Sequence, residues 1–228
     1  MALVHGIKPI VTSGLVLCLD AANRKSYPGT GTAWTDLSGN GNHGTLNNGV
    51  GYNSANGGSL VFDGIDDEAR VSAGTWSWTS VLSIGFFIYP ISSAHTFGRI
   101  TSTTSDRFEI GISPAGELSW FTGAWRTTGL TLTFNAWSYV TFSQIGPSGN
   151  PNNLNIYINA VLQSPTGLGN DFFSANTASG GTFYIGRKET GAEGTNIRIS
   201  NLQVYNRALS ATEVAQNYNA LKGRYGLS

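Results

Sequence analysis

Three aspartates crowd into one short stretch of the chain, where Asp63, Asp66 and Asp67 occur in the sequence FDGIDDE. Carboxylate oxygens are hard ligands of the kind that Ca²⁺ prefers, so this stretch could hold a calcium ion, although its spacing is not that of an EF-hand loop. The same residues are typical of a turn, because Asp63 and Asp66 can accept hydrogen bonds from nearby backbone amides while Gly64 takes a positive φ. We favour the turn and keep calcium as the alternative.

Tryptophan side chains are the second group that could do chemistry, because the flat face of an indole can stack on a pyranose ring. Two of the six tryptophans stand two residues apart in GTWSWT and would share one side of an extended segment, and three others fall in or near predicted loops. Packing between two sheets accounts for most of the six, since an indole buries a large apolar area. The candidate sugar-binding residues are Trp34, Trp76, Trp78, Trp120 and Trp125.

No pair of acidic residues has the spacing of a glycosidase. A retaining glycosidase needs two carboxyl groups about 5 to 5.5 Å apart, but Glu109 and Glu117 are single carboxylates on separate predicted strands. His5, His43 and His95 lie in different predicted loops, with no serine or cysteine nucleophile at a recognisable elbow. We therefore expect that the chain is not an enzyme and that His43 is a turn residue.

Charged side chains are few and balanced. The 13 Lys and Arg residues offset the 13 Asp and Glu residues, so the formal net charge is +0, and the basic footprint of a nucleic-acid binder is missing. Cys18 lies in the apolar run GLVLCL, where we expect a small buried residue rather than a reactive thiol. No apolar run approaches the roughly 18 residues of a membrane span, and the N-terminus does not resemble a secretory leader. Nucleic acid and membrane are not expected partners.

The spacing of apolar residues predicts strands along nearly the whole chain. Runs rich in β-branched and aromatic residues, separated by Gly, Asn, Ser or Pro, predict strands at 15–20, 59–63, 69–72, 81–89, 97–101, 107–113, 117–122, 131–134, 137–145, 153–162, 183–187 and 196–206. In 153–162, Leu154, Ile156 and Ile158 alternate with Asn155 and Tyr157, so one side of that strand should be buried and the other wet.

Three segments depart from simple strands. Ser210 and Glu213 have the spacing of a capping box, apolar residues follow at helical intervals, and Gly223 is placed to end the helix, which we expect at about 211 to 222. The apolar residues of 196–206 change phase halfway, which predicts a β-bulge near Ser200 and Asn201. The Gly- and Asn-rich segment 23–58 is expected to be an ordered excursion without regular structure.

The order of these motifs resembles LamG-like jelly rolls of the concanavalin A-like lectin and glucanase superfamily. The resemblance covers residues 13–226 and is carried by SGLVLCLDA, TDLSGNGNHGTLNNGV, SLVFDGIDDEARV, LSIGFFIYP, NIYINAVL, FYIGR and ISNLQVYNRALSATEVAQNYNALKGRYG. It implies an all-β fold of two antiparallel sheets packed face to face, with the first and last strands side by side. We therefore expect an N-terminal arm at 1–12 and one jelly-roll sandwich at 13–228 with one short C-terminal helix.

The same resemblance bears on chemistry. Glucanases of the superfamily place their acids at alternate positions of one strand, a pattern that this sequence lacks. Members often bind Ca²⁺ at an edge of the sandwich, but the Asp-Glu pair that is frequent in the family's last strand is replaced here by Ser200 and Asn201. No cofactor is required by these patterns, and Ca²⁺ stays an option at Asp63, Asp66 and Asp67.

The start SGLVLCLDAANRKSYPGTGTAWTDLSGNGNHGTL and the tail QNYNALKGRYGL are also similar to the version of this domain that is common in phage structural proteins. That similarity implies a virion protein, assembled in the host cytoplasm, which decorates or stabilises a capsid or tail and touches host glycans. Its partners would be capsid or tail proteins and further copies of itself, because a surface with few charges has little self-repulsion. The alternative is a stand-alone carbohydrate-binding module, with or without calcium.

Overall fold

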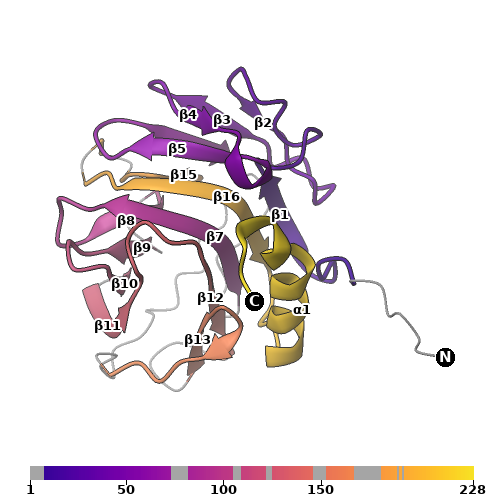
Figure 1. The fold of residues 1–228 in the computed structure, drawn as a ribbon, viewed down its shortest axis with the longest axis vertical. Helices are drawn as coiled ribbons and strands as arrows, with labels where there is room; N and C mark the ends of the chain where they lie inside the picture. The colour runs from indigo at the N-terminus through magenta and orange to yellow at the C-terminus, as the bar shows by residue number, and fades with distance from the viewer. Residues whose placement is uncertain are drawn as a thin grey trace.

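The computed structural model describes residues 8–72, 82–104, 109–121, 125–145, 153–166, 181–188, 190–191 and 193–228. Within these residues the strands form two antiparallel sheets, and the helix α1 (Ala211–Leu221) follows the last strand. Figure 1 shows the order of these elements and the short distance between α1 and the first strand. The predicted all-β sandwich with one short C-terminal helix is confirmed.

The strands of sheet A come from both ends and the middle of the chain. They are β1 (Leu15–Asp20), β4 (Gly51–Asn53), β5 (Ser59–Asp63), β7 (Ser83–Ser92), β12 (Ser138–Gln144), β13 (Leu154–Ile158), β14 (Val161–Leu162) and β16 (Asn196–Tyr205). Their order is β14-β13-β12-β7-β16-β5-β4, with β1 also paired to β16. The first and last strands therefore lie side by side, as the resemblance implied.

Sheet B packs against sheet A. Its strands are β2 (Ala33–Trp34), β3 (Gly44–Asn47), β6 (Glu68–Ser72), β8 (Gly98–Thr103), β9 (Glu109–Ile112), β10 (Glu117–Phe121), β11 (Trp125–Thr131) and β15 (Thr182–Ile185), in the order β11-β10-β9-β8-β15-β6-β3-β2. Short 3-10 turns lie at η1 (Ala55–Gly57) and η3 (Lys222–Tyr225). Among the described residues, no helix has the length and apolar character needed to cross a membrane.

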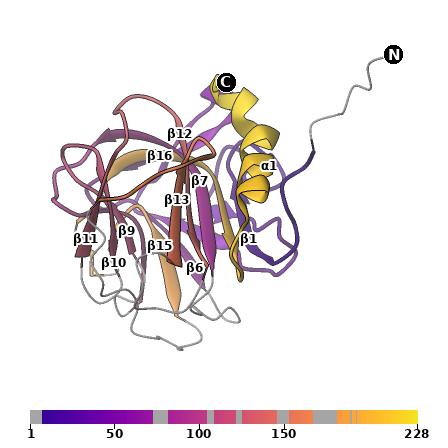
Figure 2. The same ribbon diagram turned by 90° about the horizontal axis from the view of Figure 1, so that it is seen from below.

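The main core lies between the two sheets, because alternate side chains of each strand point to the same face. Trp120 of β10 stacks on Phe142 of β12 with ring centroids 4.9 Å apart, and both side chains are fully buried. A second apolar cluster covers the other face of sheet A, where Phe87, Tyr139 and Tyr218 pack together. Figure 2 shows α1 on the side of β7 and β16 opposite to β9, β10 and β11.

The predicted strand at 153–162 is a hairpin rather than one strand. β13 turns back into β14 through Asn159 and Ala160, which both have positive φ, as the tight turns of two-residue hairpins require. The expectation that Tyr157 faces water is wrong, because its side chain is only 2% exposed and belongs to the second apolar cluster. That cluster continues under α1, so both faces of this part of sheet A are covered.

The predicted bulge in the last strand is confirmed, and the strand pairing on either side of it shows what it allows. The register of β16 against β7 shifts between Ile199 and Asn201. On its other edge, β16 pairs with β5 up to Ile199 and with β1 from Asn201 onward. The carbonyl of Ser200 accepts a hydrogen bond from the Ala21 amide at 2.7 Å. The bulge therefore lets one long strand serve two partners along the same edge.

The segment 23–58 contains more regular structure than we expected, since β2, β3, β4 and η1 all fall within it. Its first part is organised by the buried Asp36 carboxylate. That group accepts hydrogen bonds from the Cys18 amide at 2.8 Å, the Ser38 amide at 2.9 Å, the Ser38 hydroxyl at 2.7 Å and the Asn42 amide at 3.0 Å. These bonds fold the loop back toward β1 and leave β2 and β3 free to pair.

Two smaller boundaries also differ from the prediction. The strand expected at 131–134 lies earlier, at β11, because β11 pairs with β10 through Trp125 and Thr131. The helix α1, at Ala211–Leu221, has the predicted extent, but Gly223 does not cap it, because Gly223 lies inside η3. Gly226 ends the segment instead, with φ of 68° in the left-handed region, which a residue without Cβ adopts easily.

Candidate functional site

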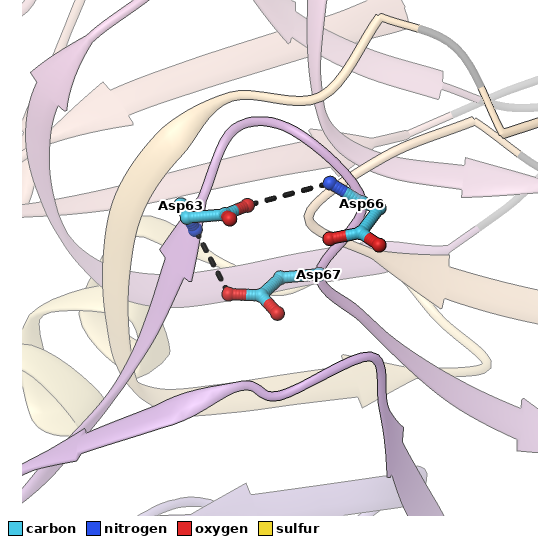
Figure 3. A group of neighbouring side chains, drawn as sticks. All are labelled: Asp63, Asp66 and Asp67. Carbon is cyan, nitrogen blue, oxygen red and sulfur yellow. Dashed lines mark hydrogen bonds between the residues drawn. The ribbon is translucent and has the colours of Figure 1, made fainter.

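The three aspartates come together at the turn between β5 and β6. One carboxylate oxygen of each residue lies within 4.8 Å of the others, with Asp63 and Asp66 exposed and Asp67 buried. Figure 3 shows Asp63 at the end of its strand, facing Asp66 and Asp67 across the turn. The set is chemically suited to a hard cation such as Ca²⁺, because it offers several carboxylate oxygens at one place.

The hydrogen bonds in this turn are those of a turn stabilised by its own side chains. Oδ1 of Asp63 accepts from the amides of Ile65 at 2.8 Å and Asp66 at 3.4 Å, and Oδ2 of Asp67 accepts from the Asp63 amide at 3.0 Å (Figure 3). Gly64 has φ of 80°, and a Cβ there would come within 2.8 Å of the Asn196 amide nitrogen. The predicted role of Asp63 and Gly64 in the turn is therefore observed, whereas the second carboxylate that accepts a backbone hydrogen bond is Asp67 and not, as predicted, Asp66.

The electrostatics of the turn also involve a neighbouring guanidinium. Arg187 donates from Nη1 to the carbonyl of Asp66 at 2.8 Å, and its Nε lies 3.0 Å from the buried carboxylate of Glu68. Burial raises the pKa of Asp67, the hydrogen bond from the Asp63 amide lowers it, and the charges of Asp63 and Asp66 raise it further. Arg187 thus joins the backbone of the turn to Glu68, with which its charge is paired.

The candidate tryptophans fall into three groups. Trp34 and Trp120 are fully buried in the main core, so their rings are covered by other side chains and are not presented to a sugar. This corrects the expectation that they stand in loops: the indoles fill space between the sheets. Trp76 and Trp78 lie outside the described residues. Trp125 is half-buried in β11 and is the candidate that the structure leaves partly open.

Trp125 belongs to an aromatic cluster on the outer face of sheet B, made of Phe97, Phe121 and Trp125. Its ring stacks on Phe97 with centroids 4.5 Å apart and planes at 5°, and it meets Phe121 at 5.3 Å. Trp120, the neighbour of Phe121 along β10, points into the core, so Phe121 points outward. All three residues are half-buried. Part of the surface of the cluster therefore remains in contact with water.

The aromatic cluster rests on a buried network of charges. The Arg99 guanidinium lies 4.3 Å from the centre of the Trp125 ring, forms an ion pair with Glu109 through Nε, and lies 2.8 Å from Glu193 through Nη2. The side chains of Arg99 and Glu109 are 3% and 1% exposed. Gly111 lets the indole ring of Trp125 pack closely on the sheet, because a Cβ at this position would come within 3.1 Å of the ring. These contacts hold Trp125 in one orientation.

Sequence reasoning missed Phe97, Phe121 and Arg99. Alternation along β10 carried a signal for Phe121, because Leu118 and Trp120 define the buried phase. The pairing of Arg99 with Glu193 joins residues far apart in the sequence, so no local pattern could indicate it. Glu117, the other acid considered for catalysis, accepts a hydrogen bond from the Gly129 amide at 2.9 Å, within the β10–β11 hairpin.

Two further candidate residues have structural surroundings. His43 accepts a hydrogen bond through Nδ1 from the Asp36 amide at 3.1 Å, which is the turn role expected for it. Cys18 is 3% exposed. Burial raises the pKa of its thiol to about 12, and the charges of Asp20 and Asp36 add to the effect. A thiol with this pKa stays protonated at neutral pH and behaves as a small apolar side chain.

Solved structures similar to this chain include a domain of an arabinanase, a receptor binding domain and a sialidase. Domain 4 of AbnA, a GH43 extracellular arabinanase from Geobacillus stearothermophilus, in complex with arabinotriose, is 19% identical with a TM-score of 0.63, over 90% of this chain and 98% of that one. The botulinum neurotoxin type G receptor binding domain is 18% identical with a TM-score of 0.61, over 90% of this chain and 51% of that one.

A sialidase from Trypanosoma rangeli, in complex with sialic acid, is 15% identical with a TM-score of 0.66, over 92% of this chain. This chain spans only 33% of the length of that sialidase. These likenesses show a shared fold. A comparison with curated protein sequences found no match.

A family model supplies the assignment. The model described as the concanavalin A-like lectin/glucanases superfamily matches residues 62–215, a stretch that runs from the end of β5 into α1 and includes the aspartate turn and the aromatic cluster. The match covers more than half of the chain and agrees with the two-sheet sandwich. The chain belongs to the concanavalin A-like lectin/glucanase superfamily.

Proposed function

We propose that this lectin-like domain binds glycans through the aromatic cluster on the outer face of sheet B. The observation that carries the proposal is the half-buried set of three rings at Phe97, Phe121 and Trp125, held in place by the Arg99 network. Rigid aromatic faces gain contact area with little loss of side-chain entropy, and carbohydrate rings offer flat C–H faces that pack on them. Because these side chains are held in place before binding, less conformational entropy is lost when a ligand binds.

One of the similar solved structures supports this proposal. The arabinanase domain, matched over 98% of its own length, was solved in complex with arabinotriose. Arabinotriose is therefore a reasonable first probe. The Arg99 and Glu109 pair is buried under the cluster and engaged with itself, so it supports the rings rather than offering an acid to a glycosidic bond. We propose a binding domain and not a glycosidase.

The experiment compares glycan binding by the native chain and by three variants in which one aromatic side chain is removed. Arabinotriose and an array of immobilised glycans are offered to the native chain, to Phe121→Ala, to Trp125→Ala and to Trp137→Ala. Trp137 is the matched control, because it packs between Tyr89 and Tyr225 on the sheet A side. Loss of binding by roughly tenfold or more in Phe121→Ala and Trp125→Ala, with Trp137→Ala unchanged, is expected. Equal glycan binding by all four proteins would refute the site.

The finer setting that we propose is a phage particle. The domain would decorate or stabilise a capsid or tail as a homo-oligomer in contact with capsid or tail proteins. Support comes from the similarity of the start and tail sequences to phage structural proteins, and from Val161 and Leu162, which are 62% and 56% exposed on the edge strand β14. Exposed apolar side chains on an edge strand favour association with another chain.

Two measurements test this setting. Light scattering on the native chain should give a mass above that of one 24.1 kDa chain, and Leu162→Glu should lower that mass. A cryo-EM map of particles should place the domain on the shell or tail. A monomer at high concentration with no affinity for particles would leave the stand-alone carbohydrate-binding module as the better assignment. Neighbouring genes that encode saccharide-processing enzymes rather than capsid proteins would point the same way.

A further inference from the structure

A cavity of about 570 Å³ lies on the far side of sheet A from the aromatic cluster. It opens to solvent between residues 8–12, β1 and the C-terminal segment, which come together in Figure 1 next to α1. Apolar walls are supplied by Ile10, Leu15, Leu37 and Leu221. Its volume is within the range of about 300 to 1,000 Å³ that is usual for small-molecule sites.

The polar groups of this cavity have an unusual arrangement. Asp20 is 4% exposed and receives hydrogen bonds on both carboxylate oxygens from Nη1 of Arg224, at 3.1 and 2.8 Å. In a bidentate pair, an arginine donates from two nitrogens in parallel to one carboxylate. Asp20 instead receives both hydrogen bonds from a single nitrogen of Arg224. The Tyr225 hydroxyl is a further neighbour of this guanidinium. The Arg224 side chain keeps 35% of its surface exposed, so it can meet a second anion.

The rim adds another positive charge. Lys8 is exposed and lines the cavity, where the charged lining residues are Lys8, Arg224 and Asp20, and Asp20 is already paired with Arg224. The Asp36 carboxylate lies behind the wall and is bonded to the Cys18 amide. The arm that carries Lys8 is fastened to α1 and β16: Gln216 donates to the Pro9 carbonyl at 2.7 Å, and the Val11 amide donates to Asn217 at 2.8 Å. The Tyr205 hydroxyl donates to the Val11 carbonyl at 3.0 Å. The wall is therefore formed before a ligand arrives.

We infer that this cavity is a binding site for a small organic carboxylate with an apolar body. The carboxylate would lie between Arg224 and Lys8, and the apolar body would lie against Ile10 and Leu221. A neutral molecule of the same shape would form no ion pair with Lys8 or with the exposed part of Arg224. The site is independent of the proposed glycan face, because it lies on the opposite side of the sandwich and shares no residue with it.

The test uses benzoate and benzamide, which have nearly the same shape and differ in charge. Binding to the full chain is followed by NMR chemical shifts and calorimetry. Benzoate should bind with saturation, and benzamide about tenfold more weakly, since hydrogen bonds to charged groups are the stronger ones. Lys8→Gln should weaken benzoate about twofold to fivefold, as is usual for a solvent-exposed charge. Lys222 lines a neighbouring groove along α1. The substitution Lys222→Gln should therefore leave the affinity for benzoate unchanged.

A second pair of variants tests the space itself. Ala220→Phe places a ring into the cavity and should abolish benzoate binding, whereas Ala215→Phe makes the same change on the same helix at a position that lines the neighbouring groove. Circular dichroism is used to check that both variants fold. Trp125→Ala, which changes the proposed glycan face, should bind benzoate like the native chain. Equal binding of benzoate and benzamide, native affinity in Ala220→Phe, or no saturable binding of benzoate would each overturn the inference.

Discussion

Asp36 organises a long surface segment through one carboxylate. Its two oxygens accept four hydrogen bonds, from the amides of Cys18, Ser38 and Asn42 and from the Ser38 hydroxyl. Hydrogen bonds to a charged group contribute more than neutral ones, and a buried donor left without its acceptor is costly. The sequence DLSGNGNH therefore encodes a fixed loop next to β1 rather than a flexible connection.

Replacing this carboxylate by an amide tests that account. We expect Asp36→Asn to lower the free energy of unfolding by about 2 to 3 kcal/mol, because one amide oxygen cannot replace two charged acceptors. Urea denaturation at pH 7 measures the change. Asp66→Asn is the control, since its side chain is exposed and should cost no more than about 0.5 kcal/mol. Equal losses in the two variants would contradict the role of Asp36.

The aspartate turn gives a second prediction at this scale. Because the turn is held by backbone amides bonded to Asp63 and Asp67, the melting temperature should be the same in EDTA and in millimolar Ca²⁺. Bound calcium would instead stabilise the fold by mass action, by about 2.7 kcal/mol at a hundredfold excess over Kd. A higher midpoint with calcium in the native chain, and none in Asp66→Ala, would establish a metal site.

At the scale of the element, α1 begins as its sequence predicts. Ser210 and Glu213 form a reciprocal capping box, in which the Ser210 amide donates to Glu213 at 2.9 Å. Arg207 adds two hydrogen bonds to the same carboxylate, at 2.6 and 3.0 Å. The helix start is thus tied to the end of β16, and this link orients α1 across the second apolar cluster.

The charge of Glu213 makes this link sensitive to acid. The hydrogen bond from Arg207, followed by that from the Ser210 amide, lowers the pKa of Glu213 from 4.5 to about 2. A carboxyl group whose folded pKa is lowered contributes stability above its unfolded pKa, and this contribution is lost as the pH falls from 4.5 toward about 2. Glu213→Gln, which keeps the shape of the box, should be less stable than the native chain at pH 7.

Urea denaturation at pH 7, 4 and 2 measures this difference. The gap between the native chain and Glu213→Gln should close at the lowest pH. Arg207→Gln should lose the same acid dependence, because it removes the partner that lowers the pKa of Glu213. A gap that stays constant down to pH 2 would show that the ion pair contributes nothing.

On the scale of the whole molecule, the two ends of the described chain fasten to the same strand. β1 pairs with β16 from Asp20 to Leu15, and Tyr225 of η3 donates to Ser200 at the bulge of β16 at 2.9 Å. Arg224 then joins η3 to Asp20. The closure of the sandwich therefore depends on contacts between residues about two hundred positions apart.

Breaking the link between the ends should weaken the entire fold. We expect Arg224→Ala to lower the free energy of unfolding by about 3 kcal/mol, because it leaves the buried Asp20 carboxylate without its partner. Adding Asp20→Asn should recover part of the loss. Arg24→Ala is the control, since that arginine is exposed and bonds within its own loop. Calorimetry should show one transition in every variant, and a loss as small as that of Arg24→Ala would contradict this role.

Local pattern decided much of this protein. Alternation of apolar residues predicted most strands, the capping box predicted the start of α1, and the change of phase predicted the bulge at Ser200, because each depends on residues within a few positions of one another. The aspartate turn belongs to the same class, since Asp63 bonds to amides two and three residues onward.

Tertiary structure decided the rest, because burial depends on which element covers a side chain. The sequence treats Trp34, Trp120 and Trp125 alike, yet the sheets enclose the first two and leave Trp125 half-open on sheet B. Tyr157 is buried only because α1 and the residues beneath it form a second cluster on sheet A. The pair Asp20 and Arg224 and the cavity beside it arise from chain ends that meet only in the folded molecule.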